Sequence, residues 1–155
     1  MPVVRASSVA LIRAPARVVY ALIADYRHGH PRILPPRTYP PPLEVERGGV
    51  GAGTIIRFQM RVFGSTRTMR SEVSEPDPGR TLVETDLGDS GARTSFTVSE
   101  VDGGAACRIE IVTEWEARGL RGWIERLTGP PLLRRVYAAE LKLLGEVAEA
   151  EARRA

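Results

Sequence analysis

The sequence contains a single cysteine, Cys107, so no disulfide can form within the chain. This scarcity suits a reducing compartment. The N-terminal stretch lacks the charged segment, apolar run and cleavage site of a signal peptide, and no apolar run approaches the ~20 residues that span a bilayer. We therefore expect a cytoplasmic protein with no integral membrane segment.

Charge of one sign is not concentrated in any part of the sequence. The 22 lysines and arginines are scattered among 19 acidic residues, which leaves a net charge of +3. Nucleic-acid binding depends on a clustered basic surface. We therefore expect no nucleic-acid partner.

Standard catalytic and cofactor motifs are also missing. No serine nucleophile elbow occurs, and the glycine-rich stretch 48–53 precedes a predicted strand rather than the helix that a phosphate site needs. Asp25, His28 and His30 match no standard metal spacing, so we expect no metal and no cofactor. His30 is a candidate general base. Cys107 is expected to be a buried strand residue, with a nucleophile as the alternative.

The 155 residues, 43% hydrophobic and 26% charged, suit one soluble globular domain spanning 1–155. Residues 3–12 predict a strand, and 15–25 predict a short amphipathic helix that starts at Pro15. The six prolines within 26–42 exclude a long helix or a central strand there; one short helical turn near 26–30 is compatible. The loop 31–42 is expected to be stiff, either as a plain connector or as a lid.

Short β segments separated by glycine and proline turns follow, and segments joined in this way must pair antiparallel. Together with 3–12 they predict about seven strands. Alternating apolar and polar residues give the sheet one apolar face, which needs a cover. The predicted segments are 43–47, 54–63, 66–75, 80–87, 92–101 and 106–116.

The C-terminus provides the cover. Residues 119–127 predict a helical turn or two, which Gly129, Pro130 and Pro131 are expected to interrupt, and 131–153 predict a long helix with one apolar stripe. The sequence therefore indicates an α+β fold in which a curved antiparallel sheet wraps a long C-terminal helix.

Three segments carry a resemblance to a known superfamily. The stretch IRAPARVVYALIADY resembles the N-terminal signature of the START-like (SRPBCC) superfamily, with Ala14-Pro15, Val19-Tyr20 and Asp25 at its marked positions. GGVGAGTIIRF resembles the glycine-rich turn into that superfamily's third strand, and EPDPGRTLVETD the turn and strand after its fourth. The resemblance covers nearly the whole chain and is closest to the polyketide cyclase/dehydrase and lipid-transport branch. It implies a helix-grip fold with an internal cavity.

The resemblance and the alternation pattern together suggest which residues line that cavity. Each of them could instead be ordinary core, since ligand sites and cores are both mostly apolar. The candidate ligand-binding residues are Ile56, Phe58, Met60, Phe96, Val98, Ile109, Ile111, Thr113, Trp115, Leu133, Tyr137 and Glu140.

Glu140 is the most informative polar residue because it falls inside the apolar stripe of the last helix. A buried, unpaired carboxylate is costly, so it must pair with an inward arginine such as Arg67, bond a hydroxyl, reach water, or become protonated. It is either a structural partner or a group that orients a ligand or moves a proton. The direction of Glu84 is ambiguous. Ser71 and Thr113 either bond inside the cavity or bond to backbone.

We therefore expect a carrier or sensor that binds a small hydrophobic molecule, such as a lipid, polyketide or isoprenoid-like compound, in an internal cavity. One alternative is a polyketide cyclase or aromatase-like enzyme that uses the same cavity. The other is a protein-interaction module, for example a homodimer, whose contact is the segment around Trp123 (119–127).

Overall fold

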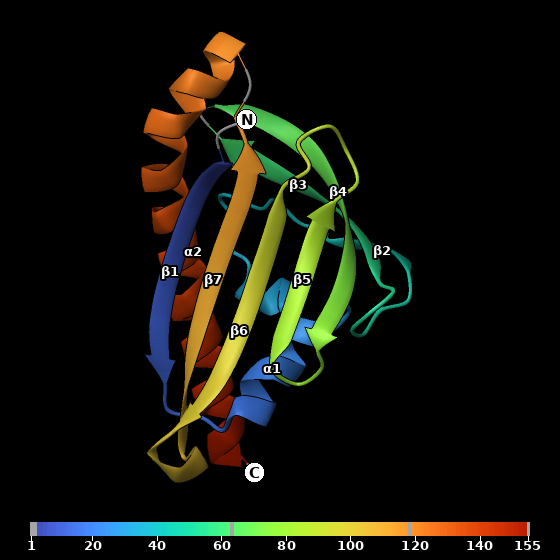
Figure 1. The fold of residues 1–155 in the computed structure, drawn as a ribbon. Coiled ribbons are helices and arrows are strands. Elements are labelled where there is room, and N and C mark those ends of the chain that lie inside the picture. The colour runs from blue at the N-terminus through green and yellow to red at the C-terminus, as the bar shows by residue number, and fades with distance from the viewer. Residues whose placement is uncertain (1–2, 63, 118, 155) are drawn as a thin grey trace.

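The computed structural model describes residues 3–62, 64–117 and 119–154, with the side chains of 62 and 119–126 outside that description. Within these ranges the chain forms seven strands and two α-helices (Figure 1). The elements are β1 (Val3–Ile12), α1 (Ala16–Ala24), the 3-10 turn η1 (His30–Ile33), β2 (Glu44–Arg47), β3 (Ile55–Val62), β4 (Ser65–Asp77), β5 (Thr81–Asp86), β6 (Arg93–Val101), the turn η2 (Asp102–Gly104), β7 (Ala106–Glu116) and α2 (Gly119–Arg154).

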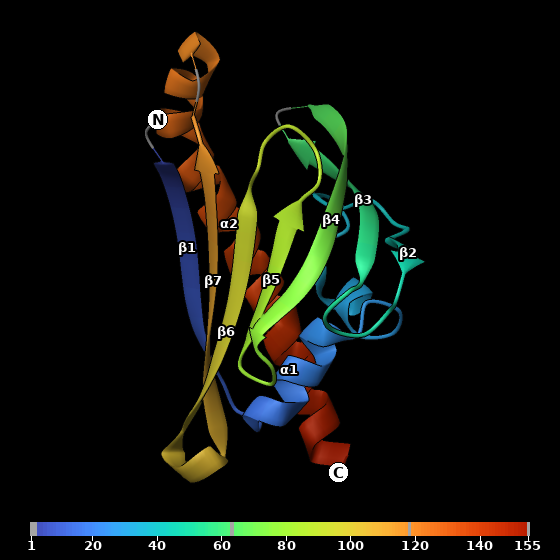
Figure 2. The ribbon, with the colours of Figure 1, turned by 45° about the vertical axis from the view of Figure 1, so that its right-hand side comes forward.

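The strands form a single antiparallel sheet in the order β1-β7-β6-β5-β4-β3-β2. Short turns join consecutive strands from β2 to β7, and β1 then pairs along the whole of β7, with Val4 opposite Trp115 and Ile12 opposite Cys107. The sheet curves, and α2 runs along its inner face (Figures 1 and 2). This confirms the predicted α+β helix-grip architecture.

The alternation of side chains along β7 explains why the sheet has a buried face. Cys107, Ile109, Ile111 and Thr113 are buried, whereas Arg108 between them is exposed. Leu144 and its neighbours on α2 meet this face, and α1 packs across one end of β6 and β7. Apolar side chains from the sheet and both helices therefore make one core, as burial of these faces requires.

The first helix and the turn after it differ slightly from expectation. The helix begins at Ala16, with Pro15 as its N-cap residue. The predicted short turn near 26–30 lies instead at His30–Ile33, with Pro31 near its start. The N–H groups of Gly29 and His30 both reach the carbonyl of Asp25, so residues 26–29 form a turn that leads into η1.

The expected interruption at Gly129, Pro130 and Pro131 is wrong, because α2 is one helix from Gly119 to Arg154. Each proline removes its own N–H donor and crowds the carbonyl four residues earlier, but α2 keeps extensive contact with β1, which favours the continuous helix. In a similar way β4 continues past Pro76 to Asp77, since its pairing with β5 is irregular between Ser74 and Asp77 and makes no demand on Pro76. None of the described helices is long and apolar enough to cross a membrane.

Candidate functional site, an internal cavity

A cavity of about 460 Å³ lies between the curved sheet and α2. Its walls come from η1, the proline-rich loop, strands β3 to β7 and α2. The volume falls within the range of ~300–1,000 Å³ that is usual for small-molecule sites. The sheet and the helix therefore leave room for a guest.

Nine of the twelve candidate residues line this cavity, and they come from β3, β6, β7 and α2. The side chains of Phe96 and Tyr137 are buried, and Phe58 is only partly buried. The nine are Ile56, Phe58, Met60, Phe96, Thr113, Trp115, Leu133, Tyr137 and Glu140.

Val98, Ile109 and Ile111 are placed differently from expectation. They are 2%, 0% and 0% exposed and belong to the packed core, outside the cavity lining. Val98 lies opposite Ile109 in the pairing of β6 with β7, the two strands that α1 contacts. These residues share the apolar face of the strands, but their side chains are packed against other core residues and do not face the cavity.

The proline-rich loop, expected to be a stiff connector or a lid, forms one wall of the cavity, and its lining residues were not among the candidates. Leu34, Tyr39 and Leu43 all line it. The Tyr39 ring lies 5.9 Å from that of Phe58, and the Arg61 N–H donates to the carbonyl of Thr38 at 2.7 Å, which ties the loop to β3. The loop is thus a fixed wall, and whether it also gates entry stays a prediction.

Glu140 projects from α2 into the cavity and is 2% exposed. Its Oε2 has no hydrogen-bond partner in the described part of the chain, and Arg67 is exposed and forms no ion pair with it there. The predicted pairing with Arg67 is therefore not found. Burial, and then the nearby Glu84 carboxylate, raises the pKa of Glu140 well above its usual value. Burial in this cavity therefore favours the protonated form of the carboxyl.

Glu84 also reaches the cavity, which settles its direction. Its Oε2 accepts a hydrogen bond from the Tyr26 hydroxyl at 2.6 Å and lies 3.7 Å from Nε2 of His30. The Nδ1 of His30 lies 2.8 Å from the carbonyl of Ile23, which can only accept, so Nδ1 carries a proton. The ring of His30 stacks on Tyr26 at 4.5 Å. We call Tyr26, His30, Glu84 and Glu140 the buried polar cluster.

A second polar group lies on the cavity wall between β6, β7 and α2. The Thr113 hydroxyl hydrogen-bonds the Tyr137 hydroxyl and lies 2.8 Å from the Thr94 hydroxyl. Thr113 therefore bonds other side chains inside the cavity. Burial is the main cause that raises the pKa of Tyr137, so this phenol stays neutral.

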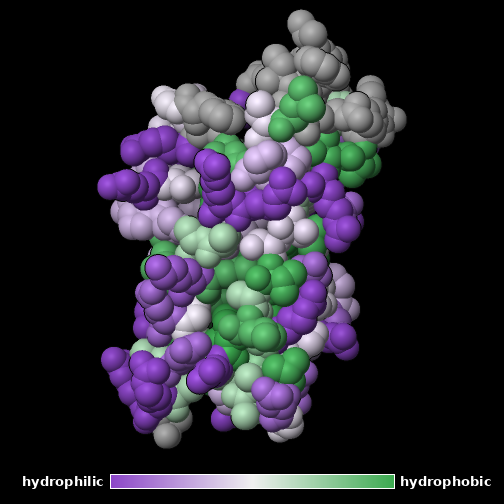
Figure 3. Space-filling view, turned by 90° about the vertical axis from the view of Figure 1, so that its left-hand side faces the viewer, coloured by the Kyte–Doolittle hydropathy of each residue, from purple (hydrophilic) through white to green (hydrophobic). Residues whose placement is uncertain are grey.

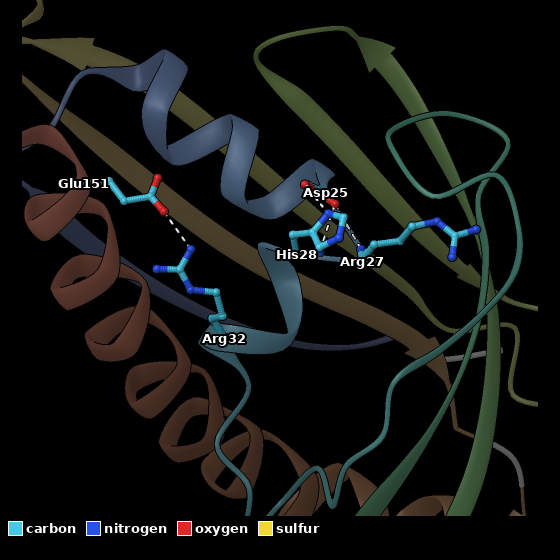
Figure 4. A network of polar contacts seen from close by, with 5 residues as sticks. All are labelled: Asp25, Arg27, His28, Arg32 and Glu151. Atoms are coloured by element: carbon cyan, nitrogen blue, oxygen red, sulfur yellow. Dashed lines mark hydrogen bonds and ion pairs between the residues drawn. The ribbon is translucent and has the colours of Figure 1, made fainter. Parts of the chain in front are cut away.

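Two other candidate residues, Cys107 and Asp25, lie in surroundings that suit a role in the fold. Cys107 is fully buried, and burial raises the pKa of its thiol to about 11, which matches the buried strand residue expected. Asp25 accepts hydrogen bonds from the backbone N–H groups of Arg27 and His28, while the His28 side chain is exposed (Figure 4). Across the described ranges no group of three ligating side chains could hold a metal ion.

An ion pair between η1 and α2 is visible in the same view. Arg32 donates to Glu151 at 2.6 Å, which holds the turn carrying His30 against the helix carrying Glu140 (Figure 4). The side chain of Trp123, named as a possible interaction residue, lies outside the described residues.

Comparison with known proteins identifies relatives of this chain. Residues 3–149 match the family described as polyketide cyclase / dehydrase and lipid transport. The NMR structure of KanY protein (ms6282) is 30% identical with a TM-score of 0.80, covering 96% of this chain and 99% of that one. No curated protein matches the chain.

Two further structures share the fold at lower identity. The Zhui aromatase/cyclase from Streptomyces sp. R1128 is 20% identical with a TM-score of 0.76, covering 96% of this chain and 94% of its own. TTHA0849 from Thermus thermophilus is 22% identical with a TM-score of 0.77, covering 97% and 99%. With 147 of its residues (3 to 149) inside the match, this chain belongs to the polyketide cyclase / dehydrase and lipid transport family of the START-like (SRPBCC) superfamily.

Proposed function

We propose that this protein binds a small, mostly apolar molecule inside the cavity, as a carrier or sensor. The observation that supports the proposal is the cavity itself, at about 460 Å³, with apolar walls and a few polar groups gathered at fixed places. Such sites gain affinity from apolar burial and orientation from a few polar contacts. The family to which the chain belongs includes lipid transport in its description, which agrees with this role.

A titration with the apolar fluorophore N-phenyl-1-naphthylamine tests the proposal. We expect saturable binding to wild type at one molecule per chain. Ala92 lines the cavity, so Ala92→Trp should fill part of the space and weaken binding by about tenfold or more. Ala105 is exposed and outside the lining, so Ala105→Trp is the matched control and should bind as wild type does. Equal binding by both variants would contradict a guest inside the cavity.

A cyclase-like enzyme is the second candidate, favoured by one specific observation. Glu140, Glu84 and His30 bring three titratable side chains to one apolar cavity, and acid and base groups gathered in such a cavity often move protons. An enzyme should lose turnover in Glu140→Gln while it still binds substrate. A carrier should show only a modest change of affinity.

The homodimer stays a prediction with its own test. β1 is an edge strand, and its Val9 and Leu11 are 47% and 71% exposed. Hydrophobic side chains gather on the face that carries β1 and α2 (Figure 3), and open edges tend to pair. Light scattering after size exclusion should give the mass of two chains, and the mass of one chain would contradict it.

A further inference from the structure

The charges of the cavity are unequally distributed between its rim and its interior. Asp86 at the rim is already satisfied, since its oxygens accept from the Gly88 N–H and the Ser90 hydroxyl. Arg67 also lines the cavity, but its side chain is exposed. The interior holds two carboxyl groups, Glu84 and Glu140. No arginine or lysine lies among the buried side chains of the described residues.

The hydrogen-bonding groups of the interior also favour a guest that donates. The Tyr26 hydroxyl is used by Glu84, and the His30 Nδ1–H is used by the Ile23 carbonyl. The Glu140 Oε2 atom is buried and has no partner within the described ranges. The interior therefore offers an unpartnered carboxyl oxygen to a guest, while the donors of Tyr26 and His30 are occupied.

We propose that the ligand's inner end is a hydrogen-bond donor, and that a protonated amine on an apolar body fits this site better than an alcohol and far better than a carboxylate. The inference rests on the proposed function, because it names the polar end of the same guest. An ammonium group donates three hydrogen bonds, and its positive charge offsets the repulsion that an ionised Glu140 would meet from Glu84. A carboxylate would add a third acidic group where no buried arginine or lysine balances it.

Proton release distinguishes the amine from other guests. In the empty cavity, burial and the Glu84 carboxylate raise the pKa of Glu140, which favours its protonated form. An ammonium group beside Glu140 favours the ionised form, so binding of the amine should release about one proton. The other titratable groups around this position are His30 on η1, Glu84 on β5, Tyr39 on the loop, Tyr26 after α1, and Tyr137 on α2.

The test compares three probes with the same ten-carbon chain: decylamine, decanol and decanoate. Isothermal titration of the full chain at about pH 7 should give affinities in the order amine, alcohol, carboxylate, with amine and carboxylate at least about tenfold apart. Titration of decylamine in two buffers with different ionisation enthalpies should show release of a proton. Decanol should release none.

Two variants on the same helix assign the effect to one carboxyl group. Glu140→Gln should remove both the preference for the amine and the proton release, while decanol still binds. Glu146 is exposed on α2, so Glu146→Gln is the matched control and should behave as wild type does. If Glu140→Gln does not fold, the affinities of the three probes for wild type and the proton release still test the inference.

The outcomes separate the inference from the proposed function. If decanol binds and decanoate binds as tightly as decylamine, the inference is overturned while the proposed function stands. Failure of all three probes to bind would overturn the proposed function and the inference with it.

Discussion

The ring of Trp115 lies directly against the backbone of α2 at Gly129. A Cβ added at Gly129 would lie 2.9 Å from Cζ2 of the indole, closer than carbon atoms approach without something shifting. Both residues line the cavity. The absence of a side chain at this position therefore lets Trp115 on the sheet meet the helix at the cavity wall.

Gly129→Ala should consequently displace Trp115. Alanine gains up to about 1 kcal/mol in helix propensity, but overpacking costs about 1–3 kcal/mol, so we expect a net loss in the free energy of unfolding and weaker binding of the fluorophore. Gly145→Ala is the matched control on the same helix, because its Cβ would lie an ordinary 3.8 Å from Ile12. That variant should be more stable by about 0.5–1 kcal/mol. Urea unfolding of both variants measures the difference, and stabilisation by Gly129→Ala would contradict the close contact.

Glu140 should make stability depend on pH in a defined direction. Its pKa is raised in the folded state, chiefly by burial, so the folded protein binds more protons than the unfolded one above about pH 4.3. The stabilisation is fully present below that pH and is lost as the pH rises through the folded-state pKa, with a slope of up to about 1.4 kcal/mol per pH unit.

Urea unfolding of wild type and Glu140→Gln at about pH 5 and pH 7.5 tests this direction. The free energy of unfolding of wild type, relative to that of the variant, should be lower at the higher pH than at the lower pH. Glu146→Gln, an exposed position on the same helix, should show no such change relative to wild type. A constant difference for Glu140→Gln would mean that its pKa is not raised.

The bond from Tyr26 to Glu84 should contribute measurably to stability. Both atoms lie in the buried polar cluster, and Tyr26 is fully buried. Tyr26→Phe removes the donor and leaves the carboxylate short of a partner, so we expect a loss of about 1.5–3 kcal/mol in the free energy of unfolding. Tyr39→Phe is the control, because no protein group in the described ranges bonds the Tyr39 hydroxyl. Equal losses in both variants would contradict the assignment.

The Cys107 thiol should be inert in the folded protein. It is fully buried, and its pKa is raised to about 11 by burial, while the thiolate is the reactive species. A chromogenic thiol reagent at about neutral pH should therefore react with one thiol per chain in urea and with almost none in buffer. Rapid reaction in buffer would show that β7 is open to solvent.

Much of the fold could be predicted because the alternation along the strands is regular. Ile56 and Phe58 on β3, and Cys107 to Thr113 on β7, show their inward face in the sequence itself. The helical stripe of α2 placed Tyr137 and Glu140 on the inner side for the same reason. A periodic pattern records which side of an element is buried.

The pattern does not record what covers that side. Val98 and Ile109 face inward like Phe96, yet they are packed within the core while Phe96 also lines the cavity. Tyr39 comes from a loop without periodicity, so its place in the wall depends on tertiary contacts. The continuity of α2 through Pro130 was missed because proline propensity is local, whereas contacts with β1 along the helix offset its cost.

The most direct test of the account is an NMR titration of isotope-labelled protein with decanol. We predict saturable shifts of backbone amides at cavity-lining residues, among them Ile56, Phe96 and Thr113, at one molecule per chain, with little change at the exposed Ala105. Absence of saturable shifts at the lining residues, or shifts confined to the outer surface, would contradict the presence of a guest inside the cavity.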